Sequence, residues 1–427
     1  MKNTTIPRRI AQASIPALIT AAVVAMILVS MASSGNAQVL TGADILVAED
    51  FATLAGRRVG LVMNQTARLS VYPGTTLDAF LRTTRCRLVS LFAPEHGLDG
   101  RALAGAIVND TVEPQSGLPV YSLYGPTKKP SPEMLRGIDV LVYDIQDIGV
   151  RSYTYISTLV KVMEGCADAG LPLVILDRPN PIGGDVVDGP VLDTAYRSFV
   201  GILPIPYIHG MTVGELAFMA NREGWLEGGR HCDITIVRMR GWRRSMSWEE
   251  TGLRWTATSP NVQSPESAFC NGVTGAIGDL RIVNIGIGTA RAFQIVAREW
   301  MDASRFADHL NSQRLSGFHF EPFTVESPQP GAGGGRMHGV HIRRTADRTS
   351  PFTAQIALLT TMRDLFPDRV RLDSIPAARW AFFDKVCGGP GVRQRLLQGA
   401  DWRDIVIAWE PDLRRFISRR ESYLLYE

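Results

Sequence analysis

Residues 139–155 decide the fold of this chain, and they read DVLVYDIQDIGVRSYTY. The run from Val140 to Tyr143 is short, apolar and rich in β-branched and aromatic residues, which is typical of a strand buried on both faces of a parallel sheet. A dense group of polar side chains follows it: Asp144, Gln146, Asp147, Arg151, Tyr153 and Tyr155. Because ligands bind at the carboxyl ends of strands in an open α/β sheet, we predict that this group forms the floor of an active site. A structural Asp–Arg pair is the alternative explanation for its charged members.

Short apolar runs alternate with helical patterns on both sides of this stretch. We predict further strands at 58–63, 88–92, 119–123, 173–176 and 233–239, and helices at 76–82, 154–169 and 213–224. Strands that alternate with helices in this way are typical of parallel βαβ units. The N-terminal part is therefore predicted to be an α/β domain with a parallel sheet.

Polar residues follow four of these strands at their carboxyl ends. They are Asn64 after the first strand, Glu95 and His96 after the second, Asp144 to Asp147 after 140–143, and Asp177, Arg178 and Asn180 after 173–176. The carboxyl ends of parallel strands share one edge of the sheet, so these segments are expected to converge on one cleft.

The pattern changes towards the C-terminus. An irregular span with glycine-rich turns from Gly272 to Gly288 is predicted to lead into a smaller α+β domain. Its predicted elements are a helix at 304–313, extended segments at 318–325 and 340–342, and helices near 351–365, 391–398 and 411–420, with a glycine-rich stretch at 331–335. We predict domains at 38–285 and 286–427.

The first 37 residues have the order of a secretory signal peptide. Lys2, Arg8 and Arg9 precede an apolar run from Ile15 to about Met31, and small residues follow up to Ala37. We predict cleavage after Ala37, a secreted or periplasmic protein and no stable membrane span in the mature chain. An uncleaved anchor and twin-arginine export are the alternatives, because the run is nearly long enough to cross a bilayer and Arg8 and Arg9 are adjacent.

The rest of the chain has a globular composition without excess charge. Of the 427 residues, 45% are hydrophobic and 20% are charged, and the formal net charge of +3 comes from the three basic residues of the leader. A neutral mature chain gives no support to nucleic acid as a partner. The cysteines lie far apart without a CxxC pair, so we expect mostly buried thiols, with one disulfide as the alternative. They are Cys86, Cys166, Cys232, Cys270 and Cys387.

Several motifs of cofactor and nucleophile chemistry are missing from the sequence. The first strand is followed by Asn64-Gln65-Thr66 instead of GxGxxG, and no GxSxG occurs. His338 and His341 are three residues apart in an extended segment, so they are expected to point to opposite faces and not to share a metal ion. We expect neither a cofactor nor a metal.

A cleft lined by carboxyl groups, amides, arginines and tyrosines suits glycoside hydrolysis, which uses an acid and usually a second carboxylate. Glu95 is the candidate acid, because a position directly after an apolar strand and Pro94 is poorly solvated, and burial favours the neutral form of a carboxyl group. Asp147 is the candidate partner. Asp144, Asp177 and Asp279 are its rivals.

The other polar residues have candidate roles in binding a sugar. Tyr153 or Tyr155 is placed to stabilise positive charge that develops on the ring. The amides of Asn64, Gln146 and Asn180 suit sugar hydroxyls or an acetamido group, and Arg151 and Arg178 suit an anionic substituent.

The blocks that contain these residues resemble those of the bacterial exo-β-N-acetylmuramidase family, in the same order. They read LFAPEHGLDG, GLPVYSLYG, DVLVYDIQDIGVRSYTYIST, VILDRPNPIGG, IPYIHGMTVGELA and TSPN, and the chain ends in a matching YLLY. The resemblance covers roughly residues 40–427. It adds His96 and His209, which lie inside these blocks, to the candidate substrate-binding residues.

This resemblance implies a secreted or periplasmic hydrolase that removes N-acetylmuramic acid from the non-reducing end of peptidoglycan fragments or muropeptides. It also implies a Rossmann-like catalytic domain, a smaller C-terminal domain and a catalytic role for Glu95. Many members carry segments resembling EGTN, GRGT and a Pro-Phe pair. Here the matching positions read Asp279-Leu280-Arg281-Ile282, Gly286-Ile287-Gly288-Thr289 and Ala292-Phe293, so the chain departs from the pattern at one wall of the sugar pocket.

Two other hypotheses compete with a glycosidase. One is a periplasmic binding protein for muropeptides that has lost catalysis, for which the altered Asp279 segment is the motive. The other is a structural cell-wall protein, which has no need for polar residues at converging strand ends.

Overall fold

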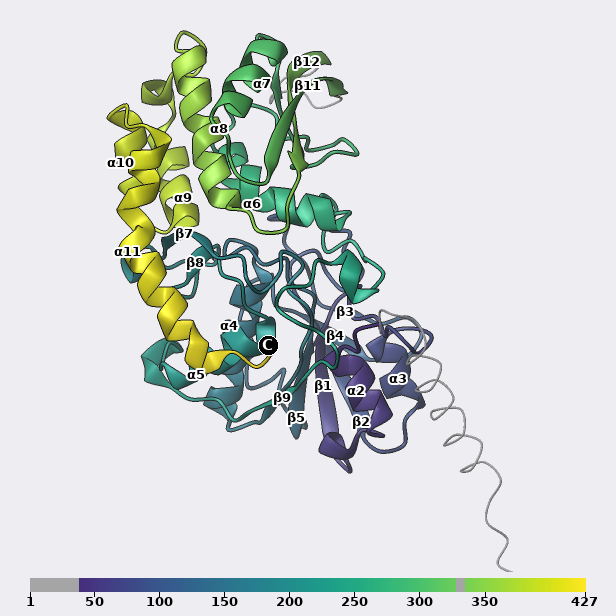
Figure 1. Cartoon of the computed structure of the whole chain (residues 1–427). Coiled ribbons are helices and arrows are strands. Elements are labelled where there is room, and N and C mark those ends of the chain that lie inside the picture. The colour runs from purple at the N-terminus through teal and green to yellow at the C-terminus, as the bar shows by residue number, and fades with distance from the viewer. Residues whose placement is uncertain (1–37, 328–334) are drawn as a thin grey trace, which may run out of the picture. The chain divides into compact units, whose positions relative to one another are not determined.

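The structure, a computed structural model, describes residues 38–327 and 335–427 (Figure 1). The predicted signal peptide and all but the last residue of the glycine-rich stretch 331–335 lie outside these ranges.

A seven-stranded sheet organises the N-terminal part, with the strand order β3-β4-β2-β1-β5-β6-β9. Its strands are β1 (Arg58–Met63), β2 (Arg87–Ala93), β3 (Thr111–Val112), β4 (Pro119–Ser122), β5 (Val140–Asp144), β6 (Leu173–Leu176) and β9 (Ile234–Val237). Every neighbouring pair is parallel except β3 and β4. Counted along the chain, the parallel strands have the order 3-2-1-4-5-6 of a doubly wound Rossmann fold. The predicted fold class is confirmed, and the order of the strands reverses between β1 and β5.

Helices cover both faces of this sheet. Leu141 and Tyr143 of β5 pack with α4 (Tyr155–Ala169) and α5 (Val213–Arg222) on one face. Val140 and Val142 pack with α2 (Gly42–Ala48) and α3 (Thr76–Arg82) on the other face. Side chains alternate between the faces of a strand, so a strand covered on both sides is apolar on both faces, as β5 is from Val140 to Tyr143, before Asp144 ends it.

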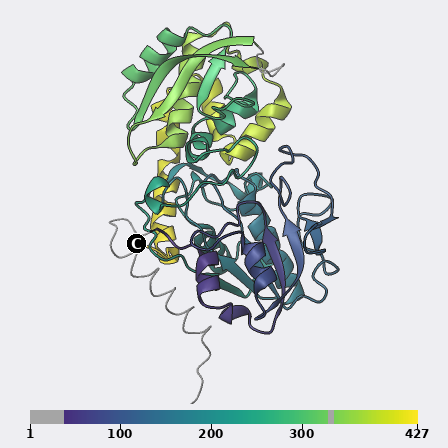
Figure 2. The same cartoon turned by 90° about the vertical axis from the view of Figure 1, so that its right-hand side faces the viewer.

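The C-terminal part is a smaller α+β arrangement (Figure 2). The antiparallel strands β10 (Ile295–Arg298), β12 (Gly335–Arg344) and β11 (Phe318–Ser327) pack against α7 (Ala303–Ser312). The helices α8 (Pro351–Leu365), α9 (Ala377–Cys387), α10 (Gly391–Leu397) and α11 (Trp402–Arg420) complete it. A two-stranded sheet of β7 (Asp188–Val191) and β8 (Pro206–Ile208) contacts α8, and β7 also contacts α11.

The largest difference from the prediction is α6 (Pro265–Leu280), a helix where glycine-rich turns were expected. Its glycines serve close packing instead. A Cβ atom at Gly272 would lie 2.8 Å from the Cδ1 atom of Ile208, and one at Gly278 would collide with Ile285. Each glycine costs a helix about 1 kcal/mol relative to alanine, and here it allows neighbouring elements to approach.

Smaller differences concern short or interrupted elements. The last long helix begins at Trp402 and contains Pro411, which was predicted to start it. The helix α9 and the short strands β7, β8 and β10 were not predicted. The domain boundary after residue 285 stays a prediction. It is notable that α6, which precedes that residue, packs against α8 and α9.

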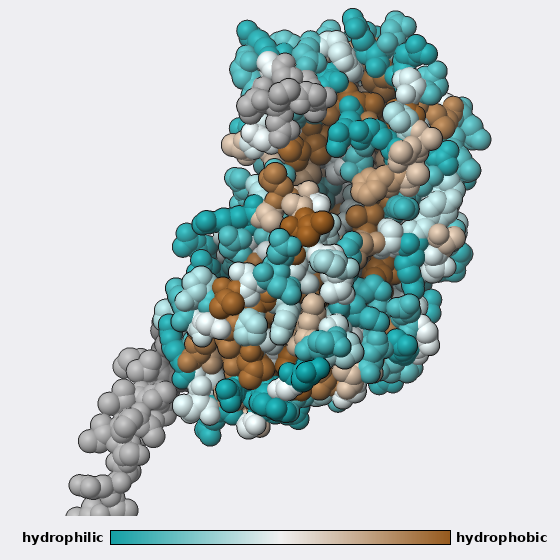
Figure 3. All heavy atoms as spheres, turned by 180° about the vertical axis from the view of Figure 1, so that it is seen from behind, coloured by the Kyte–Doolittle hydropathy of each residue, from teal (hydrophilic) through white to brown (hydrophobic). Residues whose placement is uncertain are grey.

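The surface hydropathy and the state of the cysteines are typical of a globular protein. On the face shown in Figure 3, hydrophilic residues predominate and hydrophobic residues form scattered patches. All five cysteines are buried and carry free thiols, as expected. Within the described ranges, no helix combines the length and the apolar character needed to cross a bilayer.

Candidate active site

The predicted strand-end residues do converge at one edge of the sheet, on both sides of the reversal between β1 and β5. The hydroxyl of Thr66 donates to the Oδ1 atom of Asn64 at 2.5 Å and accepts a bond from the backbone N–H of Gln146. The side-chain amide of Gln146 in turn donates to the carbonyl oxygens of Asp147 and Pro179. The ends of β1, β5 and β6 are thereby joined by buried hydrogen bonds.

Glu95 follows β2 and has both carboxylate oxygens fixed. Its Oε1 atom accepts a 2.8 Å bond from the backbone N–H of Gly105, and its Oε2 atom accepts a 2.5 Å bond from the hydroxyl of Thr154. Only 6% of the residue is exposed, so the expectation of poor solvation is confirmed. The hydroxyl of Tyr124 lies close by, and burial together with the Glu95 carboxylate raises the pKa of Tyr124 to about 12. Tyr124 is therefore a neutral hydrogen-bond donor at physiological pH.

The neighbouring His96 has a strained backbone. Its φ angle of 72° is in the left-handed region, which non-glycine residues rarely adopt, and its ring Nδ1 atom lies 2.6 Å from the carbonyl oxygen of Ala102. Such strain is concentrated at functional sites, because other positions do not retain it. The contact with Ala102 also fixes the loop that carries Gly105.

Asp147 and His209 form a buried pair with unsatisfied atoms. The Oδ2 atom of Asp147 accepts a 2.7 Å bond from Gly149 and lies 3.7 Å from the Nε2 atom of His209. The N–H of Met211 donates to the Nδ1 atom of His209, which assigns the ring proton to Nε2. Sixteen buried side-chain atoms of the described residues lack a hydrogen-bond partner, and three of them, Asp147 Oδ1, His209 Nε2 and Asn64 Nδ2, belong to this cluster. Unsatisfied buried polar atoms in a native structure call for a ligand, a water or a catalytic role.

The two tyrosines hold a segment that follows the sheet. The Tyr155 hydroxyl donates to the carbonyl oxygen of Thr258 at 2.6 Å, and the Tyr153 hydroxyl donates to its side-chain oxygen at 2.9 Å. The two rings also pack edge to face, with centroids 4.8 Å apart. Tyr153 and Tyr155 therefore position residues 257–261, and the donor capacity of both hydroxyl groups is used in doing so.

Asp144 forms a structural ion pair, with Arg178 from the end of β6 and not with Arg151 of its own stretch. Arg178 Nε and Nη2 donate to the two carboxylate oxygens of Asp144 at 2.5 and 3.0 Å, and the Thr76 hydroxyl donates to the same carboxylate. Asp144 is fully buried and Arg178 is 5% exposed. These residues join β5, β6 and α3.

Arg151 is a structural residue and not the predicted anion ligand. It is 1% exposed, and its Nη1 and Nη2 atoms donate to the carbonyl oxygens of Pro190, Ile205 and Val386. The positive charge of Arg151 thus serves to tie α9 to the N-terminal part.

Asp177 and Asn180 are also bound within the protein. Asp177 accepts bonds from the hydroxyls of Thr212 and Tyr426 and from the N–H of Gly214, so it holds the start of α5 and the C-terminus. Burial raises its pKa to about 6. Asn180 bonds to the backbone of Met211 and Ile182.

A cavity of about 970 Å³ reaches the loop that binds Glu95, although Glu95 itself is not among its lining residues. Ala104, next to the Gly105 that binds Glu95, lines it, and so does Asn261 from the segment held by the tyrosines. The predicted residue Asp279 lies in its wall beside Arg281 and Arg379. The remaining lining residues are mostly apolar: Gly275, Gly278, Val283, Asn284, Ile285, Ile287, Phe293, Pro376, Ala378 and Phe382.

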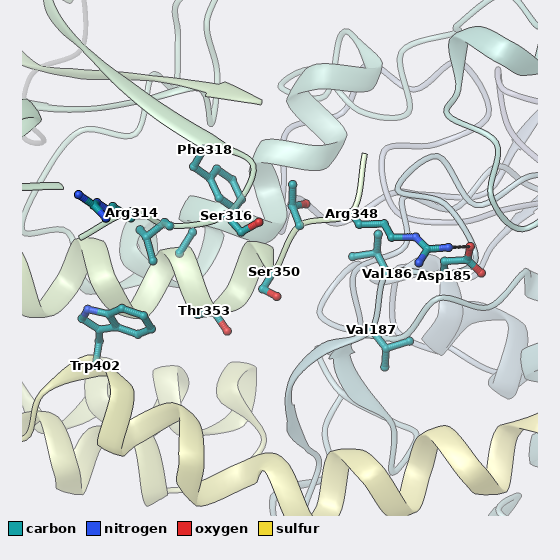
Figure 4. A pocket seen from close by; sticks show the side chains of 13 residues that line it. Asp185, Val186, Val187, Arg314, Ser316, Phe318, Arg348, Ser350, Thr353 and Trp402 are labelled. Atoms are coloured by element: carbon teal, nitrogen blue, oxygen red, sulfur yellow. Dashed lines mark ion pairs between the residues drawn. The ribbon is translucent and has the colours of Figure 1, made fainter. Parts of the chain in front are cut away.

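A second cavity, of about 660 Å³, contains none of the predicted site residues (Figure 4). Trp402, Arg314 and Phe318 line one part of it, and Arg348 at the other end lies 3.8 Å from the carboxylate of Asp185. The cavity beside Glu95 is therefore the candidate active site. Within the described part of the chain, no three His, Cys, Asp or Glu side chains are placed to hold a metal ion.

Sequence reasoning missed several residues of this site. Thr154 and Gly105 fix the orientation of Glu95, and Arg281 and Arg379 bring positive charge to the cavity. The departure from the family pattern around Asp279 was the available signal for Arg281. No local pattern indicates Arg379, which lies 100 residues away in sequence from the Asp279 carbonyl oxygen that it contacts.

Comparison with known proteins identifies the family. The N-terminal model of the exo-β-N-acetylmuramidase NamZ matches residues 59–266, and the C-terminal NamZ model matches residues 273–426. The peptidoglycan β-N-acetylmuramidase NamZ of Bacillus subtilis (strain 168) is 36% identical over 390 residues, which are 91% of this chain and 92% of that protein.

Two solved structures of DUF1343 family proteins from Bacteroides fragilis NCTC 9343 have the same fold. One has a TM-score of 0.86 at 39% identity, and the other has a TM-score of 0.70 at 30% identity. Each alignment covers 91% of this chain and 99% of the other. On this evidence, the chain belongs to the NamZ family of exo-β-N-acetylmuramidases.

Proposed function

We propose that this protein is a glycosidase that removes N-acetylmuramic acid from the non-reducing end of peptidoglycan fragments. The observation that carries the proposal is the buried Glu95 carboxyl group, held through both oxygens by Gly105 and Thr154, with Ala104, the neighbour of Gly105, in the wall of a cavity of about 970 Å³. A carboxyl group fixed in this way can deliver a proton to the leaving oxygen of a glycosidic bond. The Bacillus subtilis relative is named a peptidoglycan β-N-acetylmuramidase, which supports a glycosidase that acts on peptidoglycan.

Asp147 is the proposed second group. Its Oδ1 atom has no partner among the described residues, and the Nε2 atom of His209 is 3.7 Å from its Oδ2 atom. In this proposal His209 orients Asp147, which acts on the side of the sugar opposite the leaving group. The signal-peptide pattern of residues 1–37 supports a secreted or periplasmic location.

The test is the variant Glu95→Gln assayed with a chromogenic β-muramide. We expect turnover to fall by at least about 1,000-fold, because the amide cannot donate a proton as an acid does, while calorimetry still detects muramide binding. Glu410→Gln, which changes an exposed glutamate on α11, is the control and should retain full activity. Full activity of Glu95→Gln would remove Glu95 from the mechanism. Tight binding without turnover by the unmodified protein would favour the muropeptide-binding alternative.

A further inference from the structure

Two arginines line the candidate active-site cavity, and neither is in ion-pair contact with a carboxylate of the described part of the chain. Arg281 ends α6 in a left-handed conformation with φ of 55°, and Arg379 lies in the first turn of α9. In residues 38–327 and 335–427, neither guanidinium group forms an ion pair, and Arg379 makes one 3.3 Å bond, to the carbonyl oxygen of Asp279. Two uncompensated cations in one cavity wall favour an anionic ligand.

The carboxyl group in the same wall does little to cancel this charge. Asp279 is half-buried, and burial raises its pKa to about 7, although Arg281 and Arg379 oppose the shift. At neutral pH the Asp279 side chain is therefore protonated much of the time. The cavity keeps a positive charge that the substrate can neutralise.

The other arginines of the site are not available for this task. Arg151 is bonded to backbone carbonyl oxygens, and Arg178 is paired with Asp144. If the substrate carries a carboxylate, Arg281 and Arg379 are the cations that line the cavity next to Glu95.

N-acetylmuramic acid differs from N-acetylglucosamine by a lactyl ether, which carries a carboxylate and a methyl group. We propose that Arg281 and Arg379 form an anion site that binds this lactyl carboxylate and selects muramic acid over N-acetylglucosamine. The inference rests on the proposed function and assigns its specificity. Ile287 and Phe293 line the same cavity and offer apolar contact to the lactyl methyl group. Arginine suits the role because its planar fork matches a carboxylate.

The experiment compares three 4-nitrophenyl β-glycosides: N-acetylmuramic acid, its lactyl carboxamide and N-acetylglucosamine. For the unmodified protein, we expect the acid to have the highest kcat/KM. Arg281→Gln and Arg379→Gln should each lower kcat/KM for the acid by about 10- to 100-fold, as expected for loss of a charge-assisted hydrogen bond, and change the values for the other two by less than about 3-fold. Arg305→Gln, on the exposed side of α7, is the control and should change none of them.

The outcomes separate this inference from the proposed function. Equal losses on the acid and the carboxamide, or no loss on either, would overturn the anion site even though muramidase activity stands. If the unmodified protein hydrolyses no glycoside, the proposed function fails, and titration of free N-acetylmuramic acid and its carboxamide still tests the anion site. A preference for the acid that is lost in both arginine variants would support it. Equal affinity for the two ligands would refute it.

Discussion

The Thr154 hydroxyl donates a 2.5 Å hydrogen bond to the Oε2 atom of Glu95, across 59 residues of sequence. Glu95 lies at the end of β2, and Thr154 is the residue before α4. Since Gly105 binds the other oxygen, the carboxyl group cannot rotate without losing a bond. The proposed acid is therefore fixed by the loop that follows it, through Gly105, and by the residue before α4, Thr154.

We predict that Thr154→Val lowers kcat for a chromogenic muramide by about 10-fold, because the bond that orients the carboxyl group contributes roughly 0.5 to 1.5 kcal/mol. The substitution also leaves a buried oxygen of Glu95 without its partner, so it should lower the unfolding free energy by roughly 1 to 3 kcal/mol, and kcat is compared on the folded protein. Thr154→Ser keeps the hydroxyl and should retain activity. Unchanged kcat in Thr154→Val would show that this bond does not orient the acid.

The buried Asp147 side chain is expected to lower the unfolding free energy of the protein while it contributes to activity. A buried oxygen without a partner costs roughly 1 to 3 kcal/mol, and Asp147 Oδ1 is such an atom. We predict that Asp147→Asn lowers kcat/KM at least about 100-fold while the unfolding free energy stays the same or rises.

Asp177→Asn is the matched control for Asp147→Asn. Asp177 accepts bonds from Thr212, Gly214 and Tyr426, so its substitution should lower stability but leave the activity of the folded protein. Equal stability losses in the two variants, measured by urea unfolding, would contradict the distinction.

The fold of the N-terminal part follows closely from the sequence. The apolar run at 140–143 predicts β5, and the alternation of strands and helices predicts the parallel sheet and the edge where the polar residues meet. The helix α6 was missed because a glycine that permits close packing looks the same in a sequence as a glycine in a turn. Only the positions of Ile208 and Ile285 distinguish the two uses.

The sequence predicts that the strand-end residues share one edge of the sheet, but it does not predict which partner each side chain binds. An aspartate and an arginine after neighbouring strands can bind a substrate or each other, and Asp144 and Arg178 bind each other. The choice depends on distances between side chains, which spacing along the chain does not give. The same limit hid Arg379, which comes from a helix of the C-terminal part.

The Asp144–Arg178 pair gives a prediction about stability. Arg178→Met should lower the unfolding free energy by about 3 to 5 kcal/mol, because it leaves the buried Asp144 carboxylate without its cation. The double variant Asp144→Leu with Arg178→Met should recover much of this loss, since no charge then remains buried. Urea unfolding measures both. A single variant as stable as the unmodified protein would mean that the pair is not structural.

The buried Asp188 carboxyl group should make the unfolding free energy depend on pH. It lies at the start of β7 and accepts bonds of 2.8 and 3.0 Å from the N–H and the hydroxyl of Thr353, in the first turn of α8. Burial raises the pKa of Asp188 from 3.8 to about 6, although the Thr353 bonds oppose the shift. Between about pH 4 and pH 6 the folded protein thus holds a proton that the unfolded chain has released. The stabilisation from this proton is complete below pH 4 and is lost as the pH rises through 6.

The unfolding free energy of the unmodified protein minus that of Asp188→Asn should therefore fall by on the order of 2 to 3 kcal/mol across this range. Urea unfolding at a series of pH values measures this difference. The other carboxyl groups, including Asp177, are present in both proteins, so their contributions to the two unfolding free energies are the same and drop out of the difference. A difference that does not change with pH would mean that Asp188 titrates in the folded protein as it does in the unfolded chain.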